Sequence, residues 1–180
     1  MFHRFLTPSA LALFFTGAAN ALWAAPPVSE PVVKAAFVYN FAKYVEWPGD
    51  TFPSLQAPIR LCLYGNRDPF LAALAEMDGK VAQNRPIRVE KVAQHSDFQG
   101  CQILAVAESE RRQFAETLDA AQSLATLIVG EWEGFAGAGG AIGLVVDDER
   151  VQFEVNLAAL RRYNIKLSSQ LLKLARKVYR

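Results

Sequence analysis

Histidine is the scarcest chemically useful residue in this 180-residue chain, which has only His3 and His95. A metal site needs several converging ligands, and an activated nucleophile needs a base placed beside it. His95 lies in a polar stretch typical of a solvated surface residue, and no motif places a base near Ser109 or a metal ligand near the carboxylates. We therefore expect a binding protein rather than an enzyme, with no metal and no cofactor.

Long hydrophobic runs are also missing. A membrane span needs about 20 apolar residues, and the longest stretch, between Leu6 and Ala19, is broken by Pro8 and Gly17. A basic start, a short apolar stretch and small residues before a cleavage point are typical of a secretory signal peptide. We expect residues 1–25 to be this signal, with cleavage after Ala21 or Ala25, and residues 26–180 to be a single exported domain.

Neither sign of charge is in excess. Arg4 is the only charged residue of the first 25, so residues 26–180 carry 18 basic and 18 acidic side chains. This balance argues against a nucleic-acid binder. The distribution is less even, because the last 20 residues contain seven basic side chains and no acidic one. This segment is either a solvated helix face or a surface that meets acidic partner residues or lipid headgroups.

Cysteine is limited to Cys62 and Cys101, each next to an apolar strand-like run. An oxidising compartment favours a disulfide between them, although two buried free thiols remain the alternative. A bridge closing a loop of about 40 residues should stabilise the fold by roughly 3–4 kcal/mol.

The order of apolar patterns predicts an α/β fold. The expected helices are 30–46, 68–77, 109–122, one near 157–162 and 168–179, and the expected strands are 59–64, 86–91, 102–106, 126–130, 141–146 and 151–155. Three strands are almost wholly apolar, as in a parallel sheet covered by helices on both faces. We expect a single domain with a mostly parallel central sheet flanked by helices and an antiparallel C-terminal hairpin at its edge.

Two short motifs have competing interpretations. The run Gly137 to Gly140 resembles a phosphate-binding loop, but it precedes a strand instead of opening a helix, which favours a flexible turn. The acidic run Asp147 to Glu149 could bind a cation, but adjacent side chains in a tight turn diverge, which favours a hairpin tip.

The most distinctive segment runs from Lys34 to Pro48, where aromatic residues recur at helical spacing and Pro48 ends the helix. Other distinctive blocks are Gly139-Gly140-Ala141-Ile142, Phe153-Glu154-Val155-Asn156 and Ser168-Ser169-Gln170-Leu171-Leu172. Together, and in this order, these blocks resemble the YfiR-like family of small periplasmic proteins, whose namesake represses an inner-membrane diguanylate cyclase.

The resemblance implies a periplasmic repressor that binds the cyclase's periplasmic sensor domain and lowers cyclic di-GMP and biofilm formation. It also implies a homodimer, release by an outer-membrane lipoprotein, and a disulfide at Cys62 and Cys101. A second cysteine pair of the namesake has no counterpart here, which puts redox control through that pair in doubt.

Val151, Phe153 and Val155 alternate along the strand and should form its packed face. Strand alternation therefore predicts that Glu154 points away from this face. Ile142 and Leu160 could add apolar contacts and Lys166 a basic one. Partner binding through the C-terminal region, as the resemblance implies, makes these four residues the candidate docking site. Glu154 could also be an ordinary solvent-facing strand residue. An alternative function is a small-ligand accessory protein of another membrane sensor, such as a histidine kinase.

Overall fold

The computed structural model describes residues 28–122 and 124–180, so the predicted signal peptide lies outside the described residues. The helices are α1 (Glu30–Tyr44), α2 (Pro69–Ala75), α3 (Phe114–Ala121), α4 (Leu157–Arg162) and α5 (Ser169–Leu174), with 3-10 turns η1 (His95–Phe98) and η2 (Glu108–Gln113). The strands are β1 (Val45–Glu46), β2 (Ile59–Tyr64), β3 (Val81–Ala82), β4 (Arg85–Val92), β5 (Ile103–Val106), β6 (Leu127–Gly130), β7 (Ile142–Asp147), β8 (Arg150–Asn156), β9 (Lys166–Leu167) and β10 (Lys177–Tyr179).

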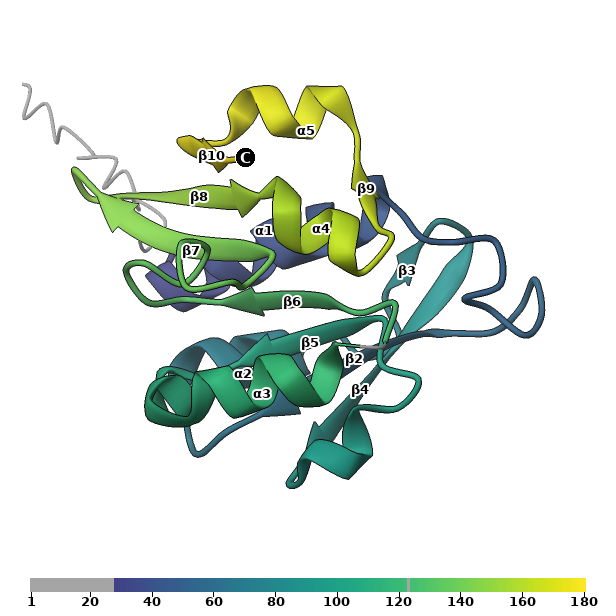
Figure 1. Ribbon diagram of the computed structural model, residues 1–180. Helices are drawn as coiled ribbons and strands as arrows, with labels where there is room; N and C mark the ends of the chain where they lie inside the picture. The colour runs from purple at the N-terminus through teal and green to yellow at the C-terminus, as the bar shows by residue number, and fades with distance from the viewer. Residues whose placement is uncertain (1–27, 123) are drawn as a thin grey trace, which may run out of the picture.

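Eight of the strands form one sheet in the order β10-β8-β7-β6-β5-β2-β4-β3 (Figure 1). Strands β4, β2, β5, β6 and β7 run parallel, whereas β7 and β8 pair in antiparallel. The short β1 and β9 form a separate antiparallel ladder. The predicted fold class, a mostly parallel sheet with flanking helices and an antiparallel hairpin, is confirmed.

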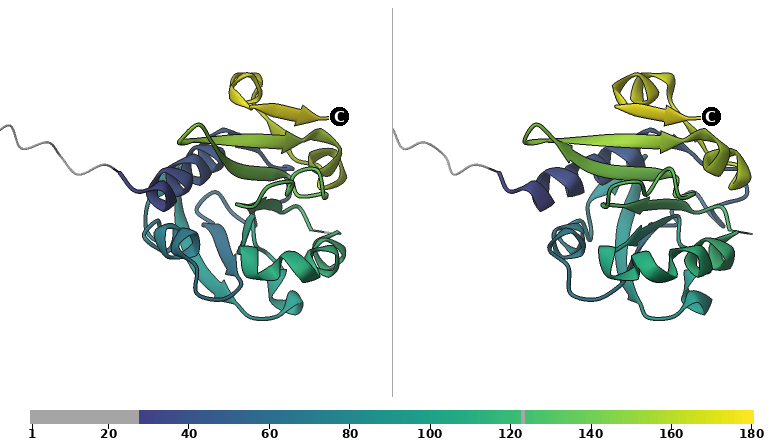
Figure 2. Two further views of the ribbon diagram at one scale, coloured as in Figure 1. Left: turned by 90° about the vertical axis from the view of Figure 1, so that its left-hand side faces the viewer. Right: turned by 60° about the vertical axis from the view of Figure 1, so that its left-hand side comes forward.

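Helices cover both faces of the sheet. Figure 2 shows α1 and α2 on one side and α3 and α4 on the other, with α5 and β10 along the top. Because both faces are covered, the central strands β5 and β6 are buried at every position. The coverage of both faces explains why the sequences of β5 and β6 are continuous apolar runs.

The first helix ends where a small ladder begins. Val45 is already extended, and it pairs with Leu167 of β9. The side chain of Gln83 donates hydrogen bonds of 2.9 and 2.8 Å to the carbonyls of Ala42 and Val45. These bonds satisfy carbonyls that the end of a helix leaves free. The helix is therefore two residues shorter than predicted.

The loop before β7 wraps around one aromatic ring. A Cβ atom at Gly130 or at Gly140 would collide with the ring of Phe135, which is wholly buried. Phe135 also packs against Phe114 and Trp132, with ring centroids 4.6 and 4.5 Å away. The glycines therefore allow close packing in the core.

The segment 168–179, predicted as one helix, divides into α5 and β10. Ala175 is extended, and the amide of Arg176 donates a 2.9 Å hydrogen bond to the carbonyl of Phe153 in β8. The open edge of β8 offers backbone partners, and Val178 and Tyr179 favour strand conformation. The prediction that the hairpin lies at the edge of the sheet is therefore wrong, because β10 pairs with β8 and is itself the edge strand.

Candidate functional site

The four residues predicted to contact a partner do not share a surface. Ile142 and Leu160 belong to the core, and Glu154 is only 4% exposed. Lys166 alone is exposed. The expectation that Ile142, Glu154 and Leu160 present side chains to solvent is wrong, because the sheet and the helices cover them. Direct contact of these three side chains with a partner would require the structure to open.

Glu154 is buried because β10 adds a neighbour to its strand. Lys177 lies opposite Glu154 in the register, and the hydroxyl of Tyr179 donates a 3.0 Å hydrogen bond to the Glu154 carboxylate. On the other face of β8, Phe153 packs into the core, 5.2 Å from the ring of Phe41. Alternation along a strand shows which residues share a face, but not whether other elements cover that face. Both Glu154 and Phe153 are buried, on opposite faces of β8.

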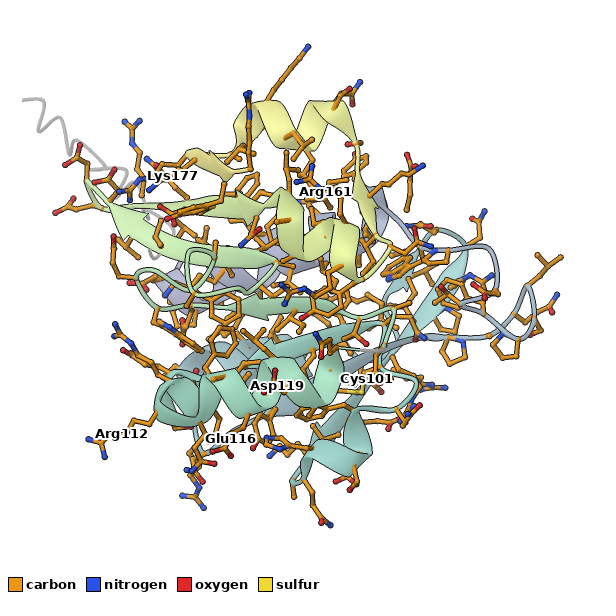
Figure 3. The ribbon with its side chains drawn as sticks, in the orientation of Figure 1. Cys101, Arg112, Glu116, Asp119, Arg161 and Lys177 are labelled. Carbon is orange, nitrogen blue, oxygen red and sulfur yellow. A yellow bond between two sulfur atoms is a disulfide. The ribbon has the colours of Figure 1, made fainter. Side chains whose placement is uncertain are left out.

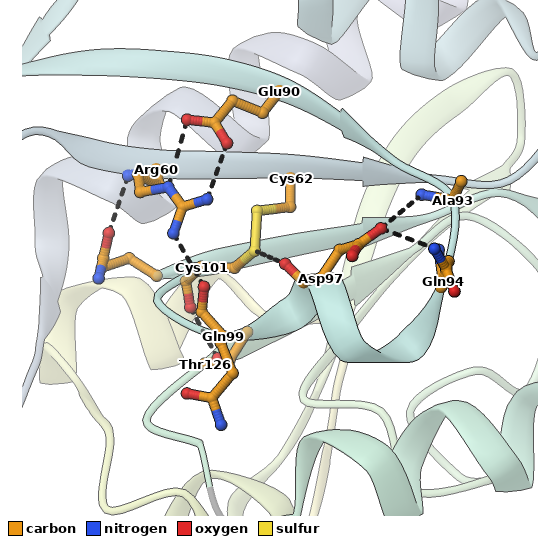
Figure 4. The surroundings of a disulfide bond; sticks show 10 residues. Arg60, Cys62, Glu90, Ala93, Gln94, Asp97, Gln99, Cys101 and Thr126 are labelled. Carbon is orange, nitrogen blue, oxygen red and sulfur yellow. Dashed lines mark hydrogen bonds and ion pairs between the residues drawn. A yellow bond between two sulfur atoms is a disulfide. The ribbon is translucent and has the colours of Figure 1, made fainter.

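The two cysteines form a disulfide, as predicted, with their Cα atoms 5.8 Å apart (Figure 4). Both are buried, Cys62 in β2 and Cys101 just before β5. The carbonyl of Cys101 accepts a 2.7 Å hydrogen bond from the buried Thr126 hydroxyl. Beside the bridge, Arg60 makes hydrogen bonds of 3.2 and 2.7 Å to the Glu90 carboxylate. The disulfide thus lies in a well-bonded region that joins neighbouring parallel strands.

An exposed group of aromatic and basic side chains lies where α1 ends. This aromatic-lysine face consists of Tyr39, Lys43, Tyr44, Lys80 and Val81. The ammonium of Lys43 lies 5.6 Å from the Tyr39 ring and 5.7 Å from the Tyr44 ring. The Tyr39 hydroxyl donates a 2.8 Å hydrogen bond to the Val81 carbonyl. Tyr44 and Val81 are 46% and 56% exposed, which leaves apolar surface available for contact.

Lys166 is next to this face. The amide of Ser168 donates a 3.3 Å hydrogen bond to the carbonyl of Tyr44, and Lys166 lies opposite Glu46 in the β1–β9 ladder. Lys166, the only exposed residue of the four predicted ones, therefore lies near the aromatic-lysine face and not beside Glu154. The sequence did contain a signal for the aromatic-lysine face, because Tyr39, Lys43 and Tyr44 belong to the distinctive segment from Lys34 to Pro48.

A cleft of about 560 Å³ opens beyond the same end of α1, between Trp47, Phe52 and Arg85. The Arg85 guanidinium stacks 3.9 Å from the Phe52 ring centroid and donates hydrogen bonds to the carbonyls of Ser54 and Ala57. Among the described residues, the indole nitrogen of Trp47 is one of three buried side-chain polar atoms without a hydrogen-bond partner. The indole N–H is a donor only, so its missing partner would be an acceptor such as an oxygen atom.

A buried ion cluster lies under the start of α1. The ammonium of Lys34 is 2.7 Å from Glu131 and 2.6 Å from Glu30, and its side chain is only 7% exposed. Burial and the nearby Asp68 raise the pKa of Glu131 to about 7, even though Lys34 opposes this shift. Burial lowers the pKa of Lys34, but the hydrogen bonds that its ammonium donates to both glutamates, together with their charges, outweigh burial and raise this pKa. This cluster anchors α1 to the loop after β6.

The polar side chains considered for catalysis have structural partners. His95 is half-buried instead of fully solvated, with its Nε2 atom 3.2 Å from the Tyr64 hydroxyl. The Ser109 hydroxyl accepts a hydrogen bond from the Asn66 amide and donates one to Glu110. Ser168 caps α5 by accepting from the Leu171 amide. None of these three groups is arranged as a nucleophile with a base.

Within residues 28–122 and 124–180, no three histidine, cysteine or acidic side chains gather where they could hold a metal ion. In that part of the chain, none of the helices combines the length and the apolar character that crossing a bilayer requires.

Two solved structures have similar folds. One is the ABC domain from Streptococcus pneumonia in complex with L-Trp, with 13% identity, a TM-score of 0.52, and coverage of 67% of this chain and 55% of that chain. The other is a conserved domain protein from Vibrio cholerae O1 biovar El Tor, with 9% identity, a TM-score of 0.55, and coverage of 81% and 60%. This chain thus spans little more than half the length of each, and the likeness extends to the fold alone.

The comparison with protein families is more specific. Residues 31–176 match the YfiR/HmsC-like family, from the start of α1 almost to β10. This range includes the four blocks on which the sequence resemblance was based, and it also includes both cysteines. The chain therefore belongs to the YfiR/HmsC-like family.

Proposed function

We propose that this protein is a periplasmic regulator that binds the periplasmic sensor domain of an inner-membrane diguanylate cyclase and represses the enzyme. The result would be less cyclic di-GMP and less biofilm. Family membership supports the proposal, and the disulfide fits an oxidising compartment such as the periplasm. By the same resemblance, the protein forms a homodimer and is withdrawn by an outer-membrane lipoprotein. The hairpin edge and the first helix are the two candidates for the dimer contact, and α1 is the better one because β10 covers β8.

The aromatic-lysine face is the observation that carries the proposal. Tyrosine is enriched among residues that dominate binding energy at interfaces, because it offers a large, rigid contact area with a polar tip. The cations of Lys43 and Lys80 beside the Tyr39 ring suit an acidic rim on the partner. We assign docking to this face, with Lys166 as the basic contact at its border.

Repression would work by a population shift. A sensor domain that exists in an active and an inactive form moves toward the form that a partner binds more tightly. The repressor therefore needs no chemistry of its own, and its effect is limited by its differential affinity for the two forms. Glu154, Ile142 and Leu160 would support the C-terminal layer from within, unless β10 detaches from β8.

Cells that export the double variant Tyr44→Ala with Lys166→Ala should keep the high cyclic di-GMP level of cells without the repressor. Loss of a central tyrosine contact commonly weakens binding about 30-fold. The readout is cellular cyclic di-GMP at matched repressor abundance in the periplasm.

The control is Val146→Ala with Arg112→Ala, which also removes one exposed apolar side chain and one cation, but on other elements. This control should repress like the wild type. Full repression by the Tyr44 variant would refute the docking face. Unchanged cyclic di-GMP on exporting the wild type would refute the repressor role itself.

A second candidate is a small-ligand accessory protein of another membrane sensor, such as a histidine kinase. The cleft beside Trp47 favours it, since Trp47 lines this cleft and its buried indole N–H has no hydrogen-bond partner. A ligand-dependent rise in melting temperature that Trp47→Phe abolishes, without any effect of the protein on cyclic di-GMP, would favour this function over repression.

A further inference from the structure

The charge of the chain is strongly divided along the sequence. Residues 28–154 carry 11 basic and 18 acidic side chains, whereas residues 155–180 carry seven basic and no acidic ones. The first part therefore has a net charge of about −7 and the second of about +7, although the total is close to zero. A division of this size gives the molecule a preferred orientation in front of any charged surface.

The division in sequence is partly a division in space, although Glu46 lies opposite Lys166 and Glu154 lies opposite Lys177. Lys177 lies in the upper layer of Figure 3, with α5 and β10, and the acidic residues Glu116 and Asp119 of α3 lie in the lower part. All seven cations of the C-terminal segment are exposed. They are Arg161, Arg162, Lys166, Lys173, Arg176, Lys177 and Arg180. Of these, Arg176 has a described acidic partner, Asp147 at 3.6 Å.

Apolar side chains protrude among these cations. Leu174, at the end of α5, is 72% exposed, and Val178 in β10 is 36% exposed. Leu174 forms what we call the basic face with Lys173, Arg176 and Lys177, whereas Val178 points to the other side of β10 from Lys177. The segment is held in place, because Leu171 of α5 is buried and the Arg176 amide bonds to β8. The leucine and its neighbouring cations are therefore presented by a folded layer.

We propose that the basic face binds the surface of an anionic phospholipid bilayer. A protruding leucine beside several cations can enter the headgroup region while the cations bind lipid phosphates, and this mode needs no complementary pocket. None of the three clefts described in residues 28–122 and 124–180 is lined by the basic face. The acidic α3 side would be repelled, so the membrane would bind one orientation.

An acidic protein surface is the main competing partner. A protein interface of ordinary stability buries a well-packed apolar centre, whereas Leu174 alone offers only a small apolar area. The observations therefore favour a lipid surface, which selects for charge density and a short apolar tip. This inference does not depend on the proposed repression, since it concerns different residues and a different ligand.

Sedimentation with vesicles tests the proposal. The protein without residues 1–25 should sediment with phosphatidylcholine vesicles that contain about one-third phosphatidylglycerol, and not with phosphatidylcholine alone. Raising the salt from low concentration to roughly 0.5 M should release it, because screening shortens the reach of the charges. Lys173→Gln with Lys177→Gln should weaken binding about 30-fold, about fivefold for each cation lost.

Arg111→Gln with Arg112→Gln is the matched control, since it removes two exposed cations from η2 on the acidic side. The control should bind vesicles like the wild type, and Leu174→Ser should bind more weakly without losing its salt dependence. Equal losses in the control and the Lys173 variant would overturn the proposal. The absence of sedimentation at low salt would also overturn it. Binding of the protein to an acidic sensor domain but not to vesicles would show that the basic face binds a protein partner.

Discussion

Replacing Cys62 and Cys101 together by alanine should lower the free energy of unfolding by about 4 kcal/mol. The bridge spans 39 positions, and a cross-link over a loop of this length removes much conformational entropy from the unfolded chain. Alanine leaves no buried hydroxyl in place of the two buried sulfur atoms. Urea denaturation followed by tryptophan fluorescence measures the change, with the m-value as a check on the unfolded state.

The wild-type protein in excess reductant is the control, and it should unfold near the midpoint of the double variant. A loss below about 1 kcal/mol would show that the unfolded chain is already constrained in this region. Under the proposed function, the less stable reduced repressor releases the cyclase. Unchanged cyclase output after Cys62→Ser would therefore defeat redox release, whatever the effect on stability.

The variant Lys34→Met should lose about 3 kcal/mol of stability at neutral pH. Methionine keeps most of the buried stem but leaves Glu131, whose side chain is 14% exposed, without its cation. The carboxyl must then either remain buried and charged or take up a proton, and both cost free energy. Thermal and urea unfolding of the variant and the wild type, measured side by side, give the difference.

The same cluster makes stability depend on pH. The pKa of Glu131 is raised from 4.5 to about 7 in the folded protein, so between these values the native state holds a proton that the unfolded state has lost. Its contribution is complete below the lower value and is lost as the pH rises through the higher one. We expect a fall on the order of 2 kcal/mol between about pH 5 and pH 8. Glu131→Gln should flatten this profile, and an unchanged profile would assign the pH dependence to other groups.

Most of the fold could be predicted from local patterns, because apolar runs and the polar hairpin tip are properties of neighbouring residues. The strands β2, β5 and β6 and the hairpin of β7 and β8 are of this kind. The end of the chain is different, because the pattern around Leu171 continues a helical spacing toward Tyr179. Residues 177–179 form a strand instead of continuing the helix because they can pair with the open edge of β8, which is distant in the sequence.

The candidate site depended even more on tertiary structure. Alternation correctly separated Glu154 from Phe153, but it could not reveal that Tyr179 would cover the carboxylate. Lys166 was expected beside Glu154, whereas the β1–β9 ladder places it opposite Glu46. The distinctive aromatic spacing in α1 pointed to an important segment. It could not distinguish the rings that pack in the core, such as Phe41, from those that face solvent.

Capture of the membrane partner tests the central claim most directly. The tagged protein is exported to the periplasm, the membranes are extracted gently, and the retained inner-membrane proteins are identified for the wild type, for Tyr44→Ala with Lys166→Ala, and for Val146→Ala with Arg112→Ala. The account predicts that a protein with a GGDEF-type cyclase domain is retained by the wild type and the control and lost from the Tyr44 variant. Retention of a histidine kinase or a transporter instead, or of the cyclase equally by all three proteins, would contradict it.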